Sequence, residues 1–103
     1  MKRATCYNSG PISSLTFITA LNNFRAADDI IRDELDMYPV NPMEVTWGLK
    51  PSNAWTLHMI KDILLLAMCR AVYFQQGWER SRGACIEYKV AKLLGKELYF
   101  ARG

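Results

Sequence analysis

Short apolar runs of strand length alternate along this chain with longer runs of helical periodicity. The strand-like runs cover 4–8, 37–40, 71–75 and 97–101, and the helical runs cover 16–35, 54–69 and 83–94. A strand that leads through a helix to another strand favours a right-handed crossover and parallel pairing. The order therefore predicts an α/β fold, a small three-layer sandwich in which helices cover both faces of a mainly parallel four-stranded sheet. At 103 residues we expect a single domain spanning 1–103.

Two polar segments follow strands and should meet at the carboxyl edge of this sheet. The first contains Ser9-Gly10-Pro11, after the first strand, and the second is 76–83, after the third. Ligand sites of open parallel sheets form outside these strand ends. Gly10 would let the backbone approach a ligand closely, and the helix after Gly83 would offer free N–H groups to an anion. The alternative for Ser9-Gly10-Pro11 is a plain turn.

Glu87 occupies an otherwise apolar stripe of the last helical run. Four apolar residues at helical spacings define that stripe: Ala84, Val90, Ala91 and Leu94. An unpaired carboxylate buried there would cost several kcal/mol or lose its charge. We therefore expect Glu87 to face a ligand cavity at the strand ends. The alternative is that it faces solvent or pairs with Arg80 or Lys89.

Asp62 repeats this anomaly in the preceding helical run, WTLHMIKDILLLAMC, where it aligns with Trp55, Met59 and Leu66. Lys61 is the residue expected to face solvent. A structural salt bridge, for instance between Asp62 and Arg70, is the alternative. Two carboxylates on apolar helix faces that flank one strand suit chemistry at an acetal carbon. One carboxylate attacks or stabilises an oxocarbenium-like centre while the other helps the leaving group depart.

Six residues then stand in the order and near-spacing of a known family: Tyr7, Gly10, Asp62, Ser81, Gly83 and Glu87. The chain resembles the nucleoside 2-deoxyribosyltransferase family, and within it the 2′-deoxynucleoside 5′-phosphate N-hydrolases. It also resembles small bacterial and phage domains of unknown function with an early SGP, an NP after the second strand, and GWERSRGA before a helical Glu. The resemblance extends over nearly all 103 residues. It implies a flavodoxin- or Rossmann-like fold of the deoxyribosyltransferase type.

The resemblance also implies roles for individual residues. Glu87 matches the nucleophile that forms a covalent deoxyribosyl intermediate at C1′, and Asp62 matches the acid that contacts the sugar and base and assists departure of the base. Tyr7 matches a tyrosine whose hydroxyl positions the nucleophile. We expect this hydroxyl and the helix N-terminus to favour the ionised form of Glu87 against desolvation. Ser81 and the backbone around Gly83 match a 5′-phosphate contact.

Two residues depart from the family pattern. Ser13 stands where the hydrolases have an arginine after the first strand, and Arg70 stands where relatives have a second aspartate. Arg80 or Arg82 could replace the missing phosphate contact. Because both the arginine and the second aspartate are missing, the alternative to an enzyme is a non-catalytic protein that senses or sequesters a nucleotide.

Several further polar and aromatic residues are candidates for a site or for the ordinary surface and core. His58 is the only histidine, and it either bonds to Asp62 or lies at the surface. No second His or Cys stands at ligand spacing, so neither a metal nor a cofactor is expected. Trp78 is the candidate for stacking on a base, whereas Trp55 is expected to pack in the core. We expect five acidic residues to form the solvated face and end of the first helical run: Asp28, Asp29, Asp33, Glu34 and Asp36.

The net charge and the cysteine content indicate which partners and which cellular location to expect. The net charge is only +3, and the basic residues are scattered, so no nucleic-acid duplex is expected. Cys6, Cys69 and Cys85 lack C-x-x-C spacing, which indicates free thiols and a cytoplasmic location. There is no apparent signal peptide, and the longest apolar run, 63–69, is too short to span a membrane.

The apolar 54–69 helix predicts at least a homodimer, and relatives complete their sites across subunit contacts.

Overall fold

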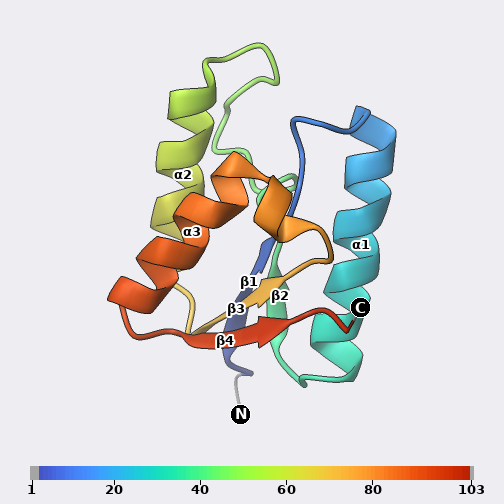
Figure 1. Ribbon diagram of the computed structural model, residues 1–103, viewed down its shortest axis with the longest axis vertical. Helices are drawn as coiled ribbons and strands as arrows, with labels where there is room; N and C mark the ends of the chain where they lie inside the picture. Colours follow the sequence, from blue (N-terminus) through green and yellow to red (C-terminus); the bar gives the residue numbers. More distant parts are fainter. Residues whose placement is uncertain (1–2, 103) are drawn as a thin grey trace.

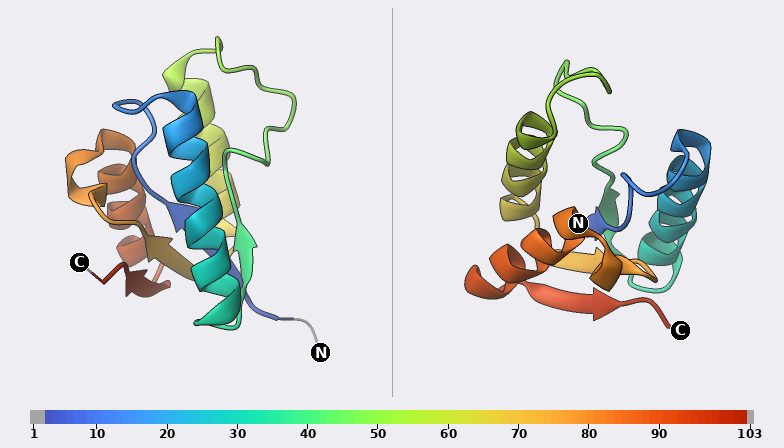
Figure 2. Two further views of the ribbon diagram at one scale, coloured as in Figure 1. Left: turned by 90° about the vertical axis from the view of Figure 1, so that its right-hand side faces the viewer. Right: turned by 45° about the horizontal axis from the view of Figure 1, so that its top comes forward.

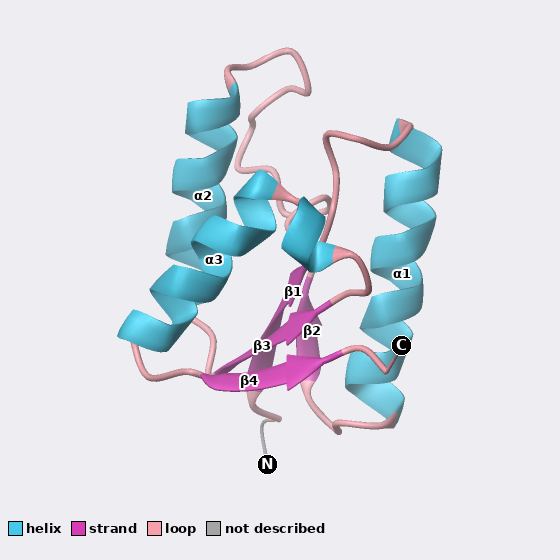
Figure 3. Cartoon of the chain, viewed as in Figure 1, coloured by secondary structure: helices cyan, strands magenta, loops and turns pink. Residues whose placement is uncertain are grey.

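A single parallel sheet organises the computed structural model, which describes residues 3–102 (Figures 1 and 3). The elements in chain order are β1 (Thr5–Ser9), α1 (Phe17–Asp33), β2 (Tyr38–Val40), α2 (Trp55–Ala67), β3 (Ala71–Phe74), a short 3-10 helix (Trp78–Arg80), α3 (Arg82–Leu93) and β4 (Glu97–Phe100). The predicted order of strands and helices is confirmed. The 3-10 helix was not expected, because its three residues lie in a polar segment without helical periodicity.

The four strands pair in the order β2-β1-β3-β4, and every pairing is parallel. Cys6 lies opposite Ala71, and Ser9 lies opposite Phe74. The chain places β2 on one side of β1 within the sheet, and it places β3 and then β4 on the other side of β1. The strand order therefore reverses between β1 and β3, which is the position where open α/β sheets bind ligands.

Helices cover both faces of the sheet, as the two further views show (Figure 2). Alternate residues of the strands point to opposite faces. On one face Tyr7, Val72 and Phe74 form a core with Leu65, Leu66 and Cys69 from the α2 segment and Ala91 from α3. On the other face Cys6, Ala71 and Tyr73 pack with Ala27 and Ile31 of α1 and with Met37. The three-layer arrangement predicted from the sequence is confirmed.

Asp28 was expected on the solvated face of α1, and this prediction is wrong. The residue is buried beside Phe24 and Ile31. Its two carboxylate oxygens accept hydrogen bonds from Asn8 Nδ2 at 2.9 Å and Asn41 Nδ2 at 3.0 Å. A buried carboxylate is tolerated because these amide donors satisfy it. Asp28 thereby fixes both the end of β1 and the start of the loop after β2 to α1.

Candidate active site

A cavity of about 320 Å³ opens beyond the end of β1, where the strand order reverses. Five segments form its walls: the loop after β1, the start of α1, the long loop between β2 and α2, the first two turns of α2, and the N-terminal half of α3 with its N-cap. Glu87, Asp62 and Lys61 all line it. The cavity thus brings together the two carboxylates that the sequence singled out, from two different helices.

Glu87 is buried, and β1 orients its carboxylate at both oxygens. Oε2 accepts a hydrogen bond from the hydroxyl of Tyr7 at 2.6 Å, and Oε1 accepts one from the hydroxyl of Ser9 at 2.7 Å. The residue does not face solvent and does not pair with Arg80 or Lys89. Because both hydroxyls come from one strand, the carboxylate is held in a single orientation at the edge of the cavity.

Burial raises the pKa of Glu87 to about 7. The hydrogen bonds from Tyr7 and Ser9 and the charge of Lys61 lower it, while the nearby Asp62 carboxylate raises it. The Tyr7 hydroxyl thus favours the ionised form of Glu87 as expected, but burial has the larger effect on the pKa. Burial also raises the pKa of Tyr7 well above its usual range, and the neighbouring Glu87 adds to this shift. Tyr7 consequently remains a hydrogen-bond donor at neutral pH.

Asp62 is buried on α2 and lines the same cavity. Burial raises its pKa, an effect that the neighbouring Lys61 ammonium partly opposes. Lys61 Nζ lies 3.2 Å from Asp62 Oδ1. The geometry of this ion pair is not that of a hydrogen bond, so among residues 3–102 Oδ1 has no hydrogen-bond donor. Arg70 does not pair with Asp62, because its guanidinium bonds to Glu97 at 2.8 Å on the exposed surface.

Lys61 was expected to face solvent, and this prediction is wrong. The residue is only 5% exposed. Its ammonium donates hydrogen bonds to the carbonyl oxygens of Pro42 at 2.6 Å and Val45 at 2.8 Å. Helical periodicity places residue 61 at the edge of the apolar face, and the loop after β2 folds over this edge. A lone cation within the apolar helix was the only signal in the sequence.

Gly10 lines the cavity, and a close contact explains why it is glycine. A Cβ atom at this position would lie 2.5 Å from Cδ of Gln75, a separation that requires one of them to move. Gln75 in turn donates from Nε2 to Asn8 Oδ1 at 2.7 Å. No local pattern in the sequence indicates a role for Gln75, because its partners lie in another segment of the chain.

The N-terminus of α3 forms one rim of the cavity. Ser81 is its N-cap, since its hydroxyl oxygen accepts a hydrogen bond from the amide of Ala84 at 3.3 Å. Ser81 and Gly83 both line the cavity, but Arg80 and Arg82 do not. The Arg82 guanidinium carbon lies 4.8 Å from the ring centroid of Trp55, which does line the cavity. Arg82 is therefore close to the site, behind this tryptophan.

The structure reverses the positions expected for the two tryptophans near the site, Trp78 and Trp55. Trp78 does not line the cavity, because it packs against Phe74 and Tyr88 at centroid distances of 5.0 and 4.9 Å. Trp55 lies on the cavity wall and is 40% exposed. The start of α2 projects past the sheet, so Trp55 has no core to enter. Trp55 is the aromatic side chain available to a planar ligand.

His58 and Ser13 also lie at this site. His58 lines the cavity, and its Nε2 lies 2.9 Å from the carbonyl oxygen of Lys50, so no hydrogen bond joins it to Asp62. Ser13, which stands where the resemblance leads one to expect an arginine, also lines the cavity. Within the described residues, 3–102, no helix is long and apolar enough to cross a membrane.

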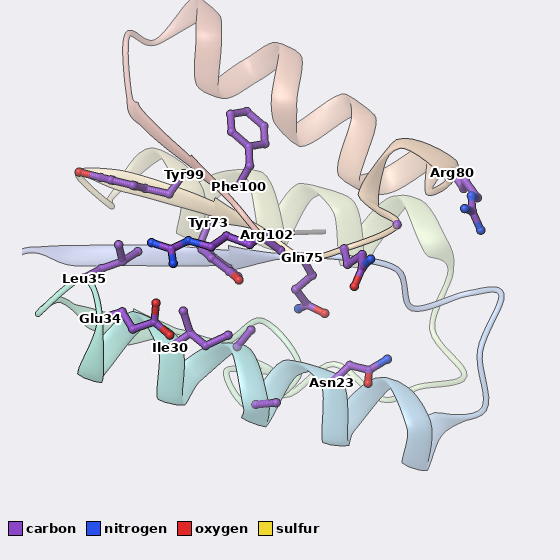
Figure 4. Close-up of a pocket in the computed structure, with 15 residues that line it drawn as sticks. Asn23, Ile30, Glu34, Leu35, Tyr73, Gln75, Arg80, Tyr99, Phe100 and Arg102 are labelled. Atoms are coloured by element: carbon purple, nitrogen blue, oxygen red, sulfur yellow. The ribbon is translucent and has the colours of Figure 1, made fainter.

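A second hollow of about 730 Å³ lies on the other side of the sheet (Figure 4). Figure 4 shows Asn23, Ile30 and Glu34 along α1, facing Tyr73 and Tyr99 of the sheet. Arg80 and Gln75 also line this groove. Its one carboxylate, Glu34, is exposed and has no acidic partner in the groove. The smaller cavity around Glu87 is therefore the candidate active site.

Comparisons with known proteins agree with this fold. A family described as "Domain of unknown function (DUF4406)" matches residues 4–100. No curated protein gives a significant sequence match. Among solved structures, the chain is similar to a 2-deoxyribosyltransferase from the psychrotolerant bacterium Bacillus psychrosaccharolyticus. The TM-score is 0.67 at 15% identity, over 94% of this chain and 71% of the other.

A 2-deoxyribosyltransferase from Leishmania mexicana is similar as well. Here the TM-score is 0.63 at 22% identity, over 94% of this chain and 63% of that enzyme. The chain thus spans less than two thirds of the length of this second enzyme. At these identities the comparison establishes the fold, and the predicted deoxyribosyltransferase-like α/β architecture is confirmed.

Proposed function

This chain belongs to the DUF4406 family, and we propose that it cleaves or transfers the N-glycosidic bond of a deoxynucleoside or its 5′-monophosphate, with Glu87 as the nucleophile. One observation carries this proposal. The Glu87 carboxylate is held at both oxygens by Tyr7 and Ser9, yet it lines a cavity. A carboxylate that served only as a structural partner would have no need of an opening beside it.

The proposed first step forms a covalent intermediate on Glu87. A Glu87 oxygen attacks C1′ of the deoxyribose, the C1′–N bond breaks, and its electron pair leaves with the base. The base gains a proton as it departs. In the second step water or another base attacks C1′ and passes a proton to the Asp62 carboxylate left by the first step, while the bond from C1′ to the Glu87 oxygen breaks and releases the carboxylate. The hydroxyls of Tyr7 and Ser9 orient the carboxylate before attack, which lowers the entropic part of the barrier.

Asp62 is the second catalytic residue in this proposal. It lines the same cavity as Glu87, and its Oδ1 lacks a hydrogen-bond donor within residues 3–102. A hydroxyl of the sugar or an N–H group of the base can supply this donor. Because burial raises the pKa of Asp62, the group holds a proton more readily than an exposed aspartate does. It can therefore pass a proton to the departing base.

The comparisons support the substrate class. Both solved structures described above are named as 2-deoxyribosyltransferases, and Trp55 on the cavity wall offers an aromatic face to a nucleobase. Either water or a second base can serve as the acceptor in the second step. Hydrolysis and transfer are therefore both part of the proposal.

A non-catalytic nucleotide-binding protein is the second candidate. It is favoured by Ser13, which lines the cavity where the family pattern has an arginine, and by Arg70, which points away from the site to Glu97. In this case the same cavity would bind a nucleoside or nucleotide without breaking the glycosidic bond.

The test is incubation of the protein with a panel of deoxynucleosides and deoxynucleoside 5′-monophosphates, followed by chromatography. An enzyme releases free base, and a transferase also forms a new nucleoside when a second base is added. The ribonucleoside of each base serves as the matched control for the 2′ position. Calorimetric binding of a panel member without release of base from any of them would support the binding protein and contradict the enzyme.

A further inference from the structure

Lys61 is a buried cation surrounded by three oxygen atoms from two segments of the chain. Its Nζ lies 2.6 Å from the carbonyl oxygen of Pro42, 2.8 Å from that of Val45, and 3.2 Å from Asp62 Oδ1. The ammonium donates hydrogen bonds to the two carbonyl oxygens and forms an ion pair with Asp62 Oδ1. Burial of a cation is costly unless it is paired in this way. The resemblance to the deoxyribosyltransferases assigns no role to this position.

The loop that Lys61 binds is one wall of the cavity, since Pro42 and Met43 line it. Asn41 holds the start of this loop. Its Oδ1 accepts from the amide of Met43 at 2.9 Å, and its Nδ2 donates to Asp28 of α1 at 3.0 Å. The wall is therefore tied to α1 through Asn41, and Lys61 ties it to α2.

We infer that Lys61 is a positioning residue of the site: its ammonium joins Asp62 to the backbone of the 42–45 loop, so that the acid and this wall are held as one unit. The catalytic consequence rests on the proposed function, whereas the link between loop and helix does not. Without the ammonium, Asp62 and the loop lose their common partner. The cavity wall can then move relative to the two carboxylates.

The charge of Lys61 acts on the same groups. Lys61 acts on Asp62 of α2 and Glu87 of α3, and the other titratable groups coupled to these two carboxyl groups are His58 on α2 and Tyr7 on β1. Glu44 of the loop is turned toward Arg25 of α1, 3.8 Å away. The Lys61 charge lowers the pKa of both Asp62 and Glu87. Its removal should raise both values and move the pH at which Glu87 becomes ionised upward.

Hydrogen exchange measured on the whole chain tests the link without any substrate. Lys61→Met keeps the length of the side chain but removes its donors. Exchange of the amides in 43–46 should become at least about 10-fold faster, as expected for the loss of charge-assisted hydrogen bonds. Lys89→Met is the matched control, because Lys89 is an exposed lysine on α3. This control should leave exchange in 43–46 unchanged.

The pH profile of base release tests the catalytic consequence. Lys61→Met should lower kcat at pH 7 by about 10- to 100-fold, typical of a misplaced site, and should shift the acid limb to higher pH. Lys61→Arg restores a cation and should return the limb to its wild-type position; this variant also serves if Lys61→Met does not fold. A wild-type protein that releases no base contradicts the proposed function, while the exchange measurement still decides the link. Unchanged exchange in 43–46, or an acid limb that does not move, would overturn the inference.

Discussion

Two opposing effects act on the carboxyl group of Glu87. Burial favours its neutral form, whereas the hydroxyls of Tyr7 and Ser9 stabilise its ionised form. Burial is the larger effect, and the resulting pKa of about 7 lies close to physiological pH. Both protonation states are then populated near neutrality. This is a common arrangement for a group that must be desolvated to react and ionised to attack.

The rate of base release should consequently follow the ionisation of Glu87. We expect kcat/KM to rise with pH through about 7, because only the carboxylate can attack C1′. The measurement is kcat/KM from pH 5 to pH 9 for two substrates whose bases have different pKa values. The acid limb of the pH profile should have its midpoint at the same pH for both substrates if it reports a group of the free protein. A flat profile across this range would contradict the assignment.

The same shift predicts how stability depends on pH. The pKa of Glu87 is 4.5 in its ordinary state and about 7 in the fold, so the folded protein binds this proton more tightly than the unfolded chain. The associated stability is fully present below pH 4.5 and is lost as the pH rises through about 7. The loss amounts to something on the order of 3 kcal/mol.

Glu87→Gln removes this titration and leaves the shape of the side chain. Urea unfolding of both proteins from pH 4 to pH 8 measures the effect. The free energy of unfolding of the variant, relative to that of the wild type, should increase as the pH rises. The reason is that only the wild type must then ionise a buried group. Since Asp62 titrates in both proteins, its contribution largely cancels in the difference. Two parallel stability curves would show that burial of Glu87 does not shift its pKa.

At the scale of elements, the N-terminus of α3 is the candidate phosphate site. Ser81 and Gly83 line the cavity there, and the guanidinium of Arg82 stacks on Trp55 nearby. Free amides at a helix N-terminus attract anions. We expect deoxynucleoside 5′-monophosphates to bind more tightly than the nucleosides, and added salt to reduce this difference.

Two arginine variants of equal charge change locate the contact. Arg82→Gln should weaken binding of the monophosphate and leave binding of the nucleoside largely unchanged. Arg80→Gln is the control, because Arg80 lines the groove on the other side of the sheet. Titration calorimetry at two salt concentrations provides both affinities. Equal affinities for nucleoside and monophosphate at both concentrations would exclude a phosphate site at this helix.

The elements could be predicted from sequence, whereas contacts across the loops could not. Strand and helix periodicities are local, so the order of elements and the apolar positions of Glu87 and Asp62 were correct. The burial of Lys61 depends on carbonyl groups of Pro42 and Val45, which lie 19 and 16 residues away. The burial of Asp28 likewise depends on Asn8 and Asn41. A pattern within one segment of the sequence cannot indicate hydrogen-bond partners that lie in another segment.

The resemblance located one contact that periodicity could not. It matched Tyr7 to a residue that positions the nucleophile, and the Tyr7 hydroxyl does bond to Glu87 across 80 positions of the chain. Ser9 was expected among the ligand contacts, and no pattern in the sequence indicated that its hydroxyl donates to Glu87. The tryptophans were assigned incorrectly because nothing in the sequence indicated how far α2 extends past the sheet.

At the scale of the whole molecule, the outer face of α2 is apolar and uncovered. Leu57, Ile60 and Leu64 of α2 form this face with Met68, the C-cap of the helix, and their exposures lie between 47% and 70%. A contiguous apolar surface on a small domain is typical of an interface. We therefore expect this face to join two copies of the chain.

Light scattering at micromolar concentration should give at least the mass of a dimer. The double variant Ile60→Lys and Leu64→Lys should be monomeric, because two charges would be buried at the interface without partners. Leu93→Lys is the control, since Leu93 is 86% exposed on α3 and outside the α2 face. This control should keep the mass of the wild type. A monomeric wild type would contradict the predicted interface.

Glu87 is the proposed nucleophile, and its replacement by glutamine removes the attacking oxygen while keeping the shape of the side chain. Release of free base by Glu87→Gln should be compared with that of the wild type and of Glu79→Gln, which alters an exposed glutamate in the 3-10 helix. We expect Glu87→Gln to fold, to bind the ligand, and to lose at least about 10²-fold in base release, while Glu79→Gln retains wild-type activity. A Glu87→Gln protein that releases base at the wild-type rate would contradict the proposed mechanism.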